Sequence, residues 1–222
     1  MFKVKKTGLI ILVIFLSLSL AGCTIIFQKG RKSDIERISA LSSRVNELEQ
    51  ARRQLEERLK QEIADKQVKI QMLEKGLVIT FIDEILFDSG KAKIKPEAHN
   101  SLDKVARVLQ ETVPDLDVGI EGHTDNEPIK YSGWKSNWEL STARATSVLH
   151  YLVDKKGIAP NRVAAIGYGE YRPVTSNTTK EGRRQNRRVE IVILPKTTKA
   201  KELGGAVEPV PSEPVAAEEN LK

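Results

Sequence analysis

The sequence contains a single cysteine, Cys23, among 222 residues. One cysteine excludes an intramolecular disulfide and a metal site built from several thiolates. A strong excess of one charge is also lacking where a globular domain is expected, because residues 77–195 hold 17 basic and 16 acidic side chains. The formal charge of +6 on the whole chain therefore does not come from one basic face. Since proteins that track phosphates need such a face, a nucleic-acid partner is disfavoured.

The amino terminus has the pattern of a secretory signal. Lys3, Lys5 and Lys6 precede an almost wholly apolar run from Leu9 to Leu20, and small residues follow it. A positive start, a short apolar core and small residues at the end are typical of a signal peptide. The alternative is an uncleaved membrane-spanning helix over residues 9–27, since about 20 apolar residues suffice to cross a bilayer.

The segment Leu20-Ala21-Gly22-Cys23 resembles the lipobox of bacterial lipoproteins. The resemblance implies that residues 1–22 are removed, that Cys23 is acylated, and that residues 23–32 form an acylated linker. Two or three acyl chains hold a protein on a membrane far more firmly than one. Thr24 stands where an Asp would favour retention in the inner membrane, so the resemblance implies lipid anchoring in the outer membrane of a Gram-negative cell, facing the periplasm.

Residues 33–76 are expected to form a coiled-coil spacer helix. This segment has no Pro and no aromatic residue, and Gly appears only at its last position. Apolar residues recur at steps of three and four, with one stutter: Ile38, Leu41, Val45, Leu48, Leu55, Leu59, Ile63, Ile70, Leu73 and Leu77. Arg52 and Lys66 at seam positions weaken a coiled coil. A homo-oligomer formed through this coil is one hypothesis, and a single solvated helix is the other.

Residues 77–195 change to alternating strand and helix patterns. Strands are expected over 77–82, 116–121, 162–168 and 189–194, and helices over 96–112, 136–153 and 180–185. Such alternation predicts an α/β layer with the helices packed on one sheet. The expected core stripe of the second helix is Trp138, Ala145, Val148, Leu149 and Leu152. Residues 196–222, rich in Pro, Ala and Glu, are expected to be a disordered tail.

Five motifs of this region occur in the order seen in the OmpA-like peptidoglycan-binding domain, which the segment resembles over about residues 77–194. They are Phe87-Asp88-Ser89-Gly90, Glu121-Gly122-His123-Thr124-Asp125, Asn137-Trp138-Glu139-Leu140-Ser141, Gly167-Tyr168-Gly169 and Asn186-Arg187-Arg188-Val189. The sequence between Asp125 and Ser141 is most similar to that of flagellar stator proteins of the MotB type. The resemblance implies an α/β (α+β) sandwich of the βαβαβ type, with a mixed four-stranded sheet and helices on one face.

The resemblance also implies a binding site for diaminopimelate in the peptidoglycan stem peptide. The free amino-acid group of that residue carries an ammonium and a carboxylate on one carbon. Asp125 can bind the ammonium, and Arg144 can bind the carboxylate through two parallel N–H groups. Thr124, Asn137 and Leu140 are supporting candidates, and Arg187 and Arg188 come next.

Three of these residues also have an ordinary structural explanation. Asp125 could cap the turn that includes Pro128, Arg144 could lie on the surface of its helix, and Arg187 could tie down the last loop. His123 is assigned a structural role, because the other two histidines lie far away in the sequence and offer no metal set. No metal and no cofactor are expected.

The combined prediction is a non-catalytic tether, which joins an acylated Cys23 in the outer membrane to peptidoglycan through the spacer helix. The alternative is a stator subunit of the MotB type, or another wall-binding subunit anchored in the inner membrane. A stator needs an acidic residue within the membrane to carry the ion, and residues 7–27 contain none. An enzyme acting on the wall is disfavoured, because no nucleophile, zinc set or close carboxylate pair emerges.

Overall fold

A computed structural model describes residues 34–130 and 132–195. The predicted signal peptide, Cys23, the acylated linker and the carboxyl-terminal tail lie outside the described residues. Within the described ranges, no helix is both long enough and apolar enough to cross a membrane.

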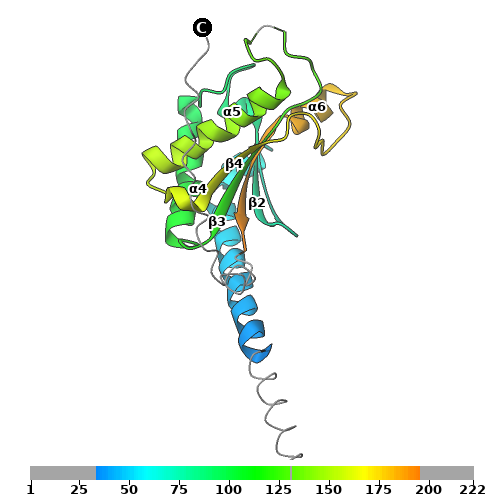
Figure 1. Cartoon of the computed structure of the whole chain (residues 1–222). Helices are drawn as coiled ribbons and strands as arrows, with labels where there is room; N and C mark the ends of the chain where they lie inside the picture. The colour runs from blue at the N-terminus through cyan, green and yellow to red at the C-terminus, as the bar shows by residue number, and fades with distance from the viewer. Residues whose placement is uncertain (1–33, 131, 196–222) are drawn as a thin grey trace, which may run out of the picture.

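The domain is built on one five-stranded mixed sheet with the strand order β1-β2-β5-β3-β4 (Figure 1). The strands are β1 (Val68–Leu73), β2 (Gly76–Ile82), β3 (Asp117–His123), β4 (Val163–Gly167) and β5 (Arg188–Leu194). Only β3 and β4 pair in parallel, and the other neighbours are antiparallel. The expected mixed α/β fold is confirmed, with five strands in place of the four predicted.

The additional strand comes from residues that the sequence pattern placed in the spacer helix. Residues 34–58 are helical, α2 follows at Lys60–Ala64, and the chain then turns at Lys66, whose φ is 56°. Strand β1 pairs with β2 as a hairpin in which Ile70 lies opposite Ile79. The prediction of helix up to residue 75 is therefore wrong after residue 64, because Val68 and Ile70 also satisfy the two-residue period of a strand.

The spacer helix divides into a free part and a docked part. Ile35, Ile38, Leu41 and Val45 are all more than half exposed, whereas Leu48, Ala51, Leu55 and Leu59 are buried in the core of the domain. In the docked part, the Arg58 guanidinium lies 2.9 Å from the Glu111 carboxylate at the end of α4. Figure 1 shows the free part projecting away from the sheet. The carboxyl-terminal half of the predicted seam thus packs against the domain of the same chain. Self-association through the amino-terminal half stays a prediction.

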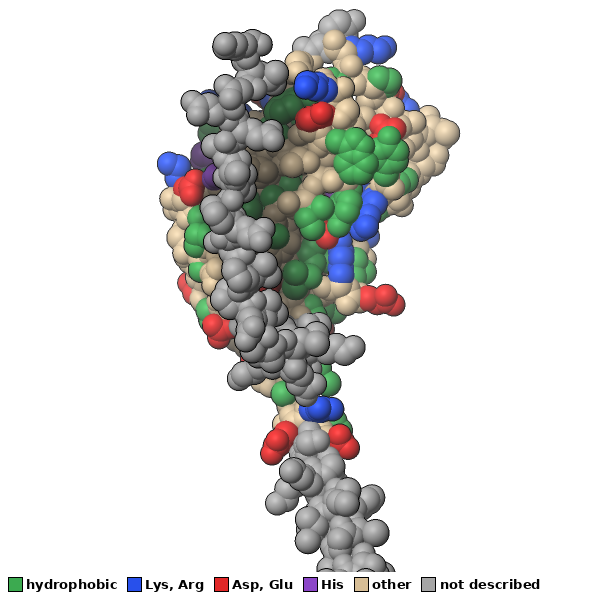
Figure 2. Space-filling model, viewed as in Figure 1, with side chains coloured by type: hydrophobic (Ala, Val, Ile, Leu, Met, Phe, Trp, Pro, Cys, Tyr) green, Lys and Arg blue, Asp and Glu red, His purple; other side chains and the backbone are tan. Residues whose placement is uncertain are grey.

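Two long helices, α4 (His99–Glu111) and α5 (Asn137–His150), pack beside the sheet. A π-helical turn (Tyr151–Lys155) extends α5, and the shorter segments are α3 (Asp83–Leu86), α6 (Lys180–Asn186) and 3-10 turns at Pro96–Ala98 and Pro160–Arg162. The core lies between helices and sheet, and its larger members are Phe81, Ile79, Leu102, Leu109, Ile120, Val148, Leu152 and Ile191. On the face shown in Figure 2, acidic and basic side chains are interspersed rather than separated into fields.

Helix α5 lies unusually close to the sheet because glycine faces it. A Cβ placed on Gly122 of β3 would lie 2.1 Å from the backbone oxygen of Ser141, and one on Gly167 of β4 would lie 2.1 Å from Thr142 Oγ1. This contact line buries Ser141, Ala145 and Val148 and leaves Trp138 47% exposed. The prediction of Trp138 as a core residue is therefore wrong, while Ala145, Val148 and Leu152 are confirmed as core.

The other face of the sheet carries a compact polar cluster around His123. Lys75 Nζ lies 2.6 Å from Glu121 and 2.7 Å from Glu190, and Arg188 Nε lies 2.6 Å from Glu190. The His123 ring stacks on Tyr168 with centroids 5.2 Å apart. Both ring nitrogens are buried without a hydrogen-bond partner in the described part of the chain. Burial and the nearby Arg188 charge lower the pKa of His123 to about 3, so the ring is neutral at physiological pH.

We predict that Gly122→Ala lowers the free energy of unfolding by about 3 kcal/mol, because the new methyl group would overlap backbone that cannot move aside without shifting α5. The measurement is urea denaturation followed by circular dichroism. Gly119→Ala is the matched control on the same strand, since its Cβ would meet only Val192 at 3.9 Å. Equal stabilities of the two variants would contradict the close packing of α5.

His123 should make the fold sensitive to acid. The unfolded chain binds a proton at His123 below about pH 6.5, whereas the folded chain binds it only near pH 3. Stability is therefore lost as the pH falls through the unfolded pKa. Relative to the variant His123→Gln, the natural chain should lose about 2 kcal/mol of unfolding free energy between pH 7 and pH 5. If the free energy of unfolding changed with pH in the same way in both proteins, the His123 ring would not be held neutral.

Candidate functional site

A pocket of about 500 Å³ opens where β3 ends and α5 begins. Residues between Asp83 and Gly90 form one wall, residues 124–125, 127–130 and 132 form a second, and the first turns of α5 form the third. Six of the seven candidates named from the sequence line this pocket: Thr124, Asp125, Asn137, Leu140, Arg144 and Arg187. The structure therefore brings together residues that are up to 63 positions apart in the chain.

Asp125 lies just beyond the end of β3 and is 5% exposed. Its Oδ1 accepts a hydrogen bond from the backbone N–H of Glu127 at 3.2 Å, so the predicted capping of the turn is present. Its Oδ2 accepts a hydrogen bond from the Arg187 guanidinium at 2.6 Å. Asp125 is thus held in one orientation by the turn and by an ion pair, and it faces the pocket as a carboxylate.

Arg144 is 2% exposed, so the interpretation as a surface helix residue is wrong. Its Nη2 lies 2.8 Å from Asp83 Oδ2, and its Nε donates to the backbone carbonyl of Lys91 at 3.0 Å. The guanidinium also stacks over the Phe87 ring, 5.3 Å from the centroid. These contacts fix the plane of the guanidinium at the pocket wall.

Asp83 is a functional candidate that the sequence analysis did not identify. It follows β2 directly and pairs with Arg144, but its Oδ1 is buried with no hydrogen-bond partner in the described ranges. Burial raises the pKa of its carboxyl to about 6, although Arg144 and Arg187 act in the opposite direction. The sequence signal was the adjacent pair Asp83-Glu84 at a strand end, where side chains commonly reach a site.

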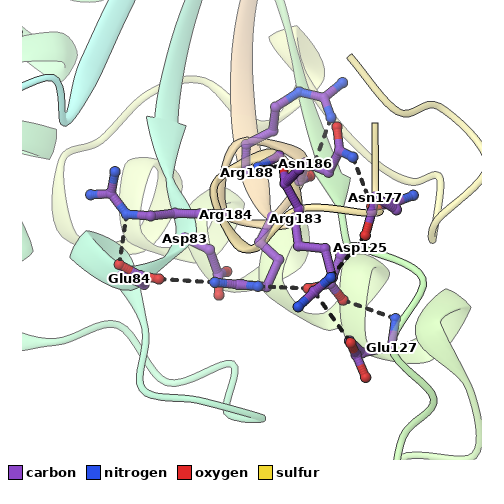
Figure 3. A network of polar contacts seen from close by, with 12 residues as sticks. Asp83, Glu84, Asp125, Glu127, Asn177, Arg183, Arg184, Asn186 and Arg188 are labelled. Carbon is purple, nitrogen blue, oxygen red and sulfur yellow. Dashed lines mark hydrogen bonds and ion pairs between the residues drawn. The ribbon is translucent and has the colours of Figure 1, made fainter. Parts of the chain in front are cut away.

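Arg187 links two acidic groups across the pocket. Besides its bond to Asp125, its Nη2 donates to Glu84 Oε1 at 2.9 Å, and Glu84 also receives Arg184 Nε at 3.1 Å. Figure 3 shows this chain of alternating charges running from Arg184 through Glu84 to Asp125. Arg187 therefore both holds the last loop and lines the pocket. Although burial acts against its charge, the hydrogen bonds that Arg187 donates to both carboxylates raise its pKa.

The three uncharged candidates shape the pocket. The Asn137 amide donates to the carbonyls of Asp125 and Glu127 and, at 2.7 Å, to Glu170 Oε2. Leu140 is buried and supplies an apolar wall. Thr124 Oγ1 is buried without a partner in the part of the chain that the structure describes, while its N–H donates to the Gly169 carbonyl.

Arg188 and His123 do not line the pocket. Arg188 bonds to Glu190 and to the carbonyls of Asn186 and Arg172, and in Figure 3 it lies beside Asn186. Among the described residues, Glu121, His123 and Glu190 form a group of metal-ligand type whose ligand atoms lie within 4.8 Å of one another. The Lys75 ammonium contacts both of these carboxylates and supplies the positive charge there.

The arrangement can bind a small zwitterion without catalysis. The pocket presents acidic groups at Asp125, Glu84 and Asp83 and planar cationic forks at Arg144 and Arg187, all already paired with one another. Because these charges are already paired within the protein, a ligand that carries both charges can share the pairs without leaving any buried charge unpaired. A ligand with only one charge would leave a charged side chain of the pocket without a partner.

Comparison with known proteins relates this chain to one family. The model of the OmpA family matches residues 86–187. Motility protein B of Bacillus subtilis (strain 168) is 43% identical over 150 residues, which are 68% of this chain and 57% of that protein. The probable lipoprotein YiaD of Escherichia coli (strain K12) is 38% identical over 120 residues, which are 54% of this chain and 52% of that protein. The chain therefore spans little more than half the length of these two relatives.

A solved structure agrees with the sequence comparison. The cell wall anchor of the T6SS from Pseudomonas aeruginosa superposes with a TM-score of 0.59 and 34% identity, covering 65% of this chain and 99% of that one. The match therefore includes nearly all of the solved chain and about two thirds of this one. On these grounds the chain belongs to the OmpA family.

Proposed function

We propose that the domain binds the peptidoglycan stem peptide without catalysis and so tethers the cell envelope to the wall. The observation that carries the proposal is the pocket in which Asp125 and Arg144 face the same space, Asp125 held by the partly buried Arg187 and Arg144 by the buried Asp83. The likeness to a cell wall anchor and to motility protein B supports a wall ligand.

In the proposed complex, the free amino-acid group of diaminopimelate enters the pocket. Its ammonium binds Asp125 and shares that carboxylate with Arg187, and its carboxylate binds the Arg144 fork and shares it with Asp83. Leu140 contacts the apolar side-chain carbons, while Asn137 holds the loop that carries Asp125. Since both charged ends are satisfied at once, the site discriminates against simple amines and simple acids.

The proposed membrane attachment is an acylated Cys23 in the outer membrane. The lipobox-like segment before Cys23 supports it, and so does the similarity to a probable lipoprotein. The spacer helix would then set the distance between the lipid surface and the wall. Within the described residues, the free part of the helix begins at residue 34 and the docked part begins at Leu48. The free part therefore adds about 20 Å before the domain begins.

A second candidate is a MotB-like stator subunit, or another wall-binding subunit anchored in the inner membrane. The specific observation in its favour is the 43% identity to motility protein B. Against the ion-carrying role stands the absence of any Asp or Glu between residues 7 and 27. The two candidates share the same wall-binding site and differ in the membrane that holds the amino terminus.

Asp125→Asn should reduce binding to diaminopimelate-containing stem peptide by at least tenfold, because the ligand ammonium would lose its carboxylate in a partly desolvated site. Calorimetric titration gives the affinity, and circular dichroism checks the fold. Asp154→Asn is the matched control, since it removes the same charge at an exposed position beyond the far end of α5. Unchanged affinity in Asp125→Asn would remove this residue from the site.

Arg144→Lys tests the planar fork while the charge is kept. A lysine provides a point charge and cannot hold Asp83, the Lys91 carbonyl and a ligand carboxylate together. We expect at least a tenfold loss of stem-peptide affinity in the same titration, with the melting temperature lowered by several degrees. Full affinity in the variant would show that charge alone suffices at this position.

Cys23→Ala should abolish incorporation of labelled palmitate and release the chain from the outer-membrane fraction, because the thiol is the proposed acylation site. Sucrose-gradient fractionation of cells that express either form makes the measurement. Labelling that persists in the variant would contradict lipidation at Cys23. Natural chain found in the inner-membrane fraction would favour the second candidate.

A further inference from the structure

Two aromatic side chains are exposed side by side beside the pocket. Trp138 is 47% exposed and Tyr171 is 65% exposed, and their rings are stacked with centroids 5.0 Å apart and planes 20° apart. By contrast, Phe81 and Phe87 are buried. Because the two rings stack on each other, their exposed surface is the outer part of the pair, and an exposed aromatic pair of this kind can serve as a contact surface. We call Trp138 and Tyr171 the aromatic platform.

The platform is joined to the candidate site through neighbouring residues. Trp138 follows Asn137 and Tyr171 follows Glu170, and the Asn137 amide donates to the Glu170 carboxylate at 2.7 Å. The same amide holds the carbonyl of Asp125. One side chain therefore ties the platform and the acidic end of the pocket into one rigid unit.

The platform is also held in place from below and has polar groups at its rim. Gly169 lies directly under Trp138, because a Cβ on this glycine would approach the indole to 3.5 Å. At the rim, Ser136 donates to the Glu139 carboxylate at the start of α5, and Glu170 precedes Tyr171 and accepts from Asn137, which precedes Trp138. A flat apolar face with hydrogen-bonding groups around it is complementary to a pyranose ring, which presents C–H groups on its face and hydroxyl groups at its edge.

We propose that the aromatic platform is a glycan subsite, on which one sugar ring of the peptidoglycan strand stacks while the attached stem peptide enters the pocket. The proposal rests on the proposed function, because it assigns the second part of the same ligand. The stem peptide is covalently attached to the sugar chain, so a surface that adjoins a peptide pocket is the place where the glycan must pass.

The extent of the platform favours a sugar over a protein partner. A specific protein interface buries about 800 Å² on each side, whereas this surface consists of two rings with charged and polar neighbours. Such a size matches one or two sugar rings. The contact would add affinity to the peptide site through a shared ligand, in the manner of two linked binding modules.

The test compares three ligands with the full chain: a disaccharide stem peptide with diaminopimelate, the same stem peptide without sugar, and glycan strands freed of peptide. Trp138→Ala should weaken binding of the first about tenfold and abolish binding of the glycan strands, with the sugar-free peptide unaffected. Tyr171→Ala should act in the same direction, and Trp138→Tyr should restore most of the affinity because it keeps a flat ring. Met72→Ala is the matched control, an exposed apolar side chain on β1 at the opposite edge of the sheet.

The outcomes separate the two proposals. If the natural chain binds both stem peptides equally and Trp138→Ala changes neither, the glycan subsite is overturned and the peptide site stands. If the natural chain binds glycan strands in a Trp138-dependent manner but binds no free stem peptide, the subsite is supported and the proposed peptide site fails. If no ligand binds, both proposals are overturned. A uniform loss with all ligands and a lowered melting temperature in Trp138→Tyr as well would assign the ring a structural role and overturn the subsite.

Discussion

Two ion pairs hold the candidate site together: the buried pair of Asp83 with Arg144 and the partly buried pair of Asp125 with Arg187. They join the segment after β2, the end of β3, the start of β5 and the second turn of α5. A charge that is removed from water is tolerated only when it is paired and hydrogen-bonded. The four segments must therefore meet in one arrangement, and the pocket exists because they do. The close approach of α5 to Gly122 is what brings Arg144 within reach of Asp83.

The same constraint explains why a binding site can be preformed yet adaptable. Five charged side chains of the pocket are already paired with one another: Asp83, Glu84, Asp125, Arg144 and Arg187. In the proposed complex, a zwitterionic ligand exchanges these internal pairs for mixed ones. The gain in free energy on binding is the difference between those sets, which favours selectivity for the matching charge pattern over very high affinity. The proposed glycan subsite would add an apolar contact at Trp138 and Tyr171.

Much of the fold and the site could be predicted from the sequence. The strands around Val118, Ile191 and Ile79 are rich in apolar β-branched residues, and six of the seven candidates named from the motifs line one pocket. Three features could not be predicted, for physical reasons. Ile70 fits both a helical seam and a strand, so β1 was missed. The partners Asp83 and Glu84 depend on contacts that span more than 60 residues. Trp138 was placed in the core because helix periodicity does not reveal that glycines on the sheet rotate the contact line of α5.

The central claim is that the pocket recognises both charges of one amino-acid group. The most direct measurement changes the ligand rather than the protein. Calorimetric titration of the full chain would use the stem peptide, the same peptide with the free diaminopimelate carboxylate amidated, and the same peptide with its free amine acetylated. The account predicts at least a tenfold loss of affinity for each modified peptide. Equal affinity for all three peptides would contradict it.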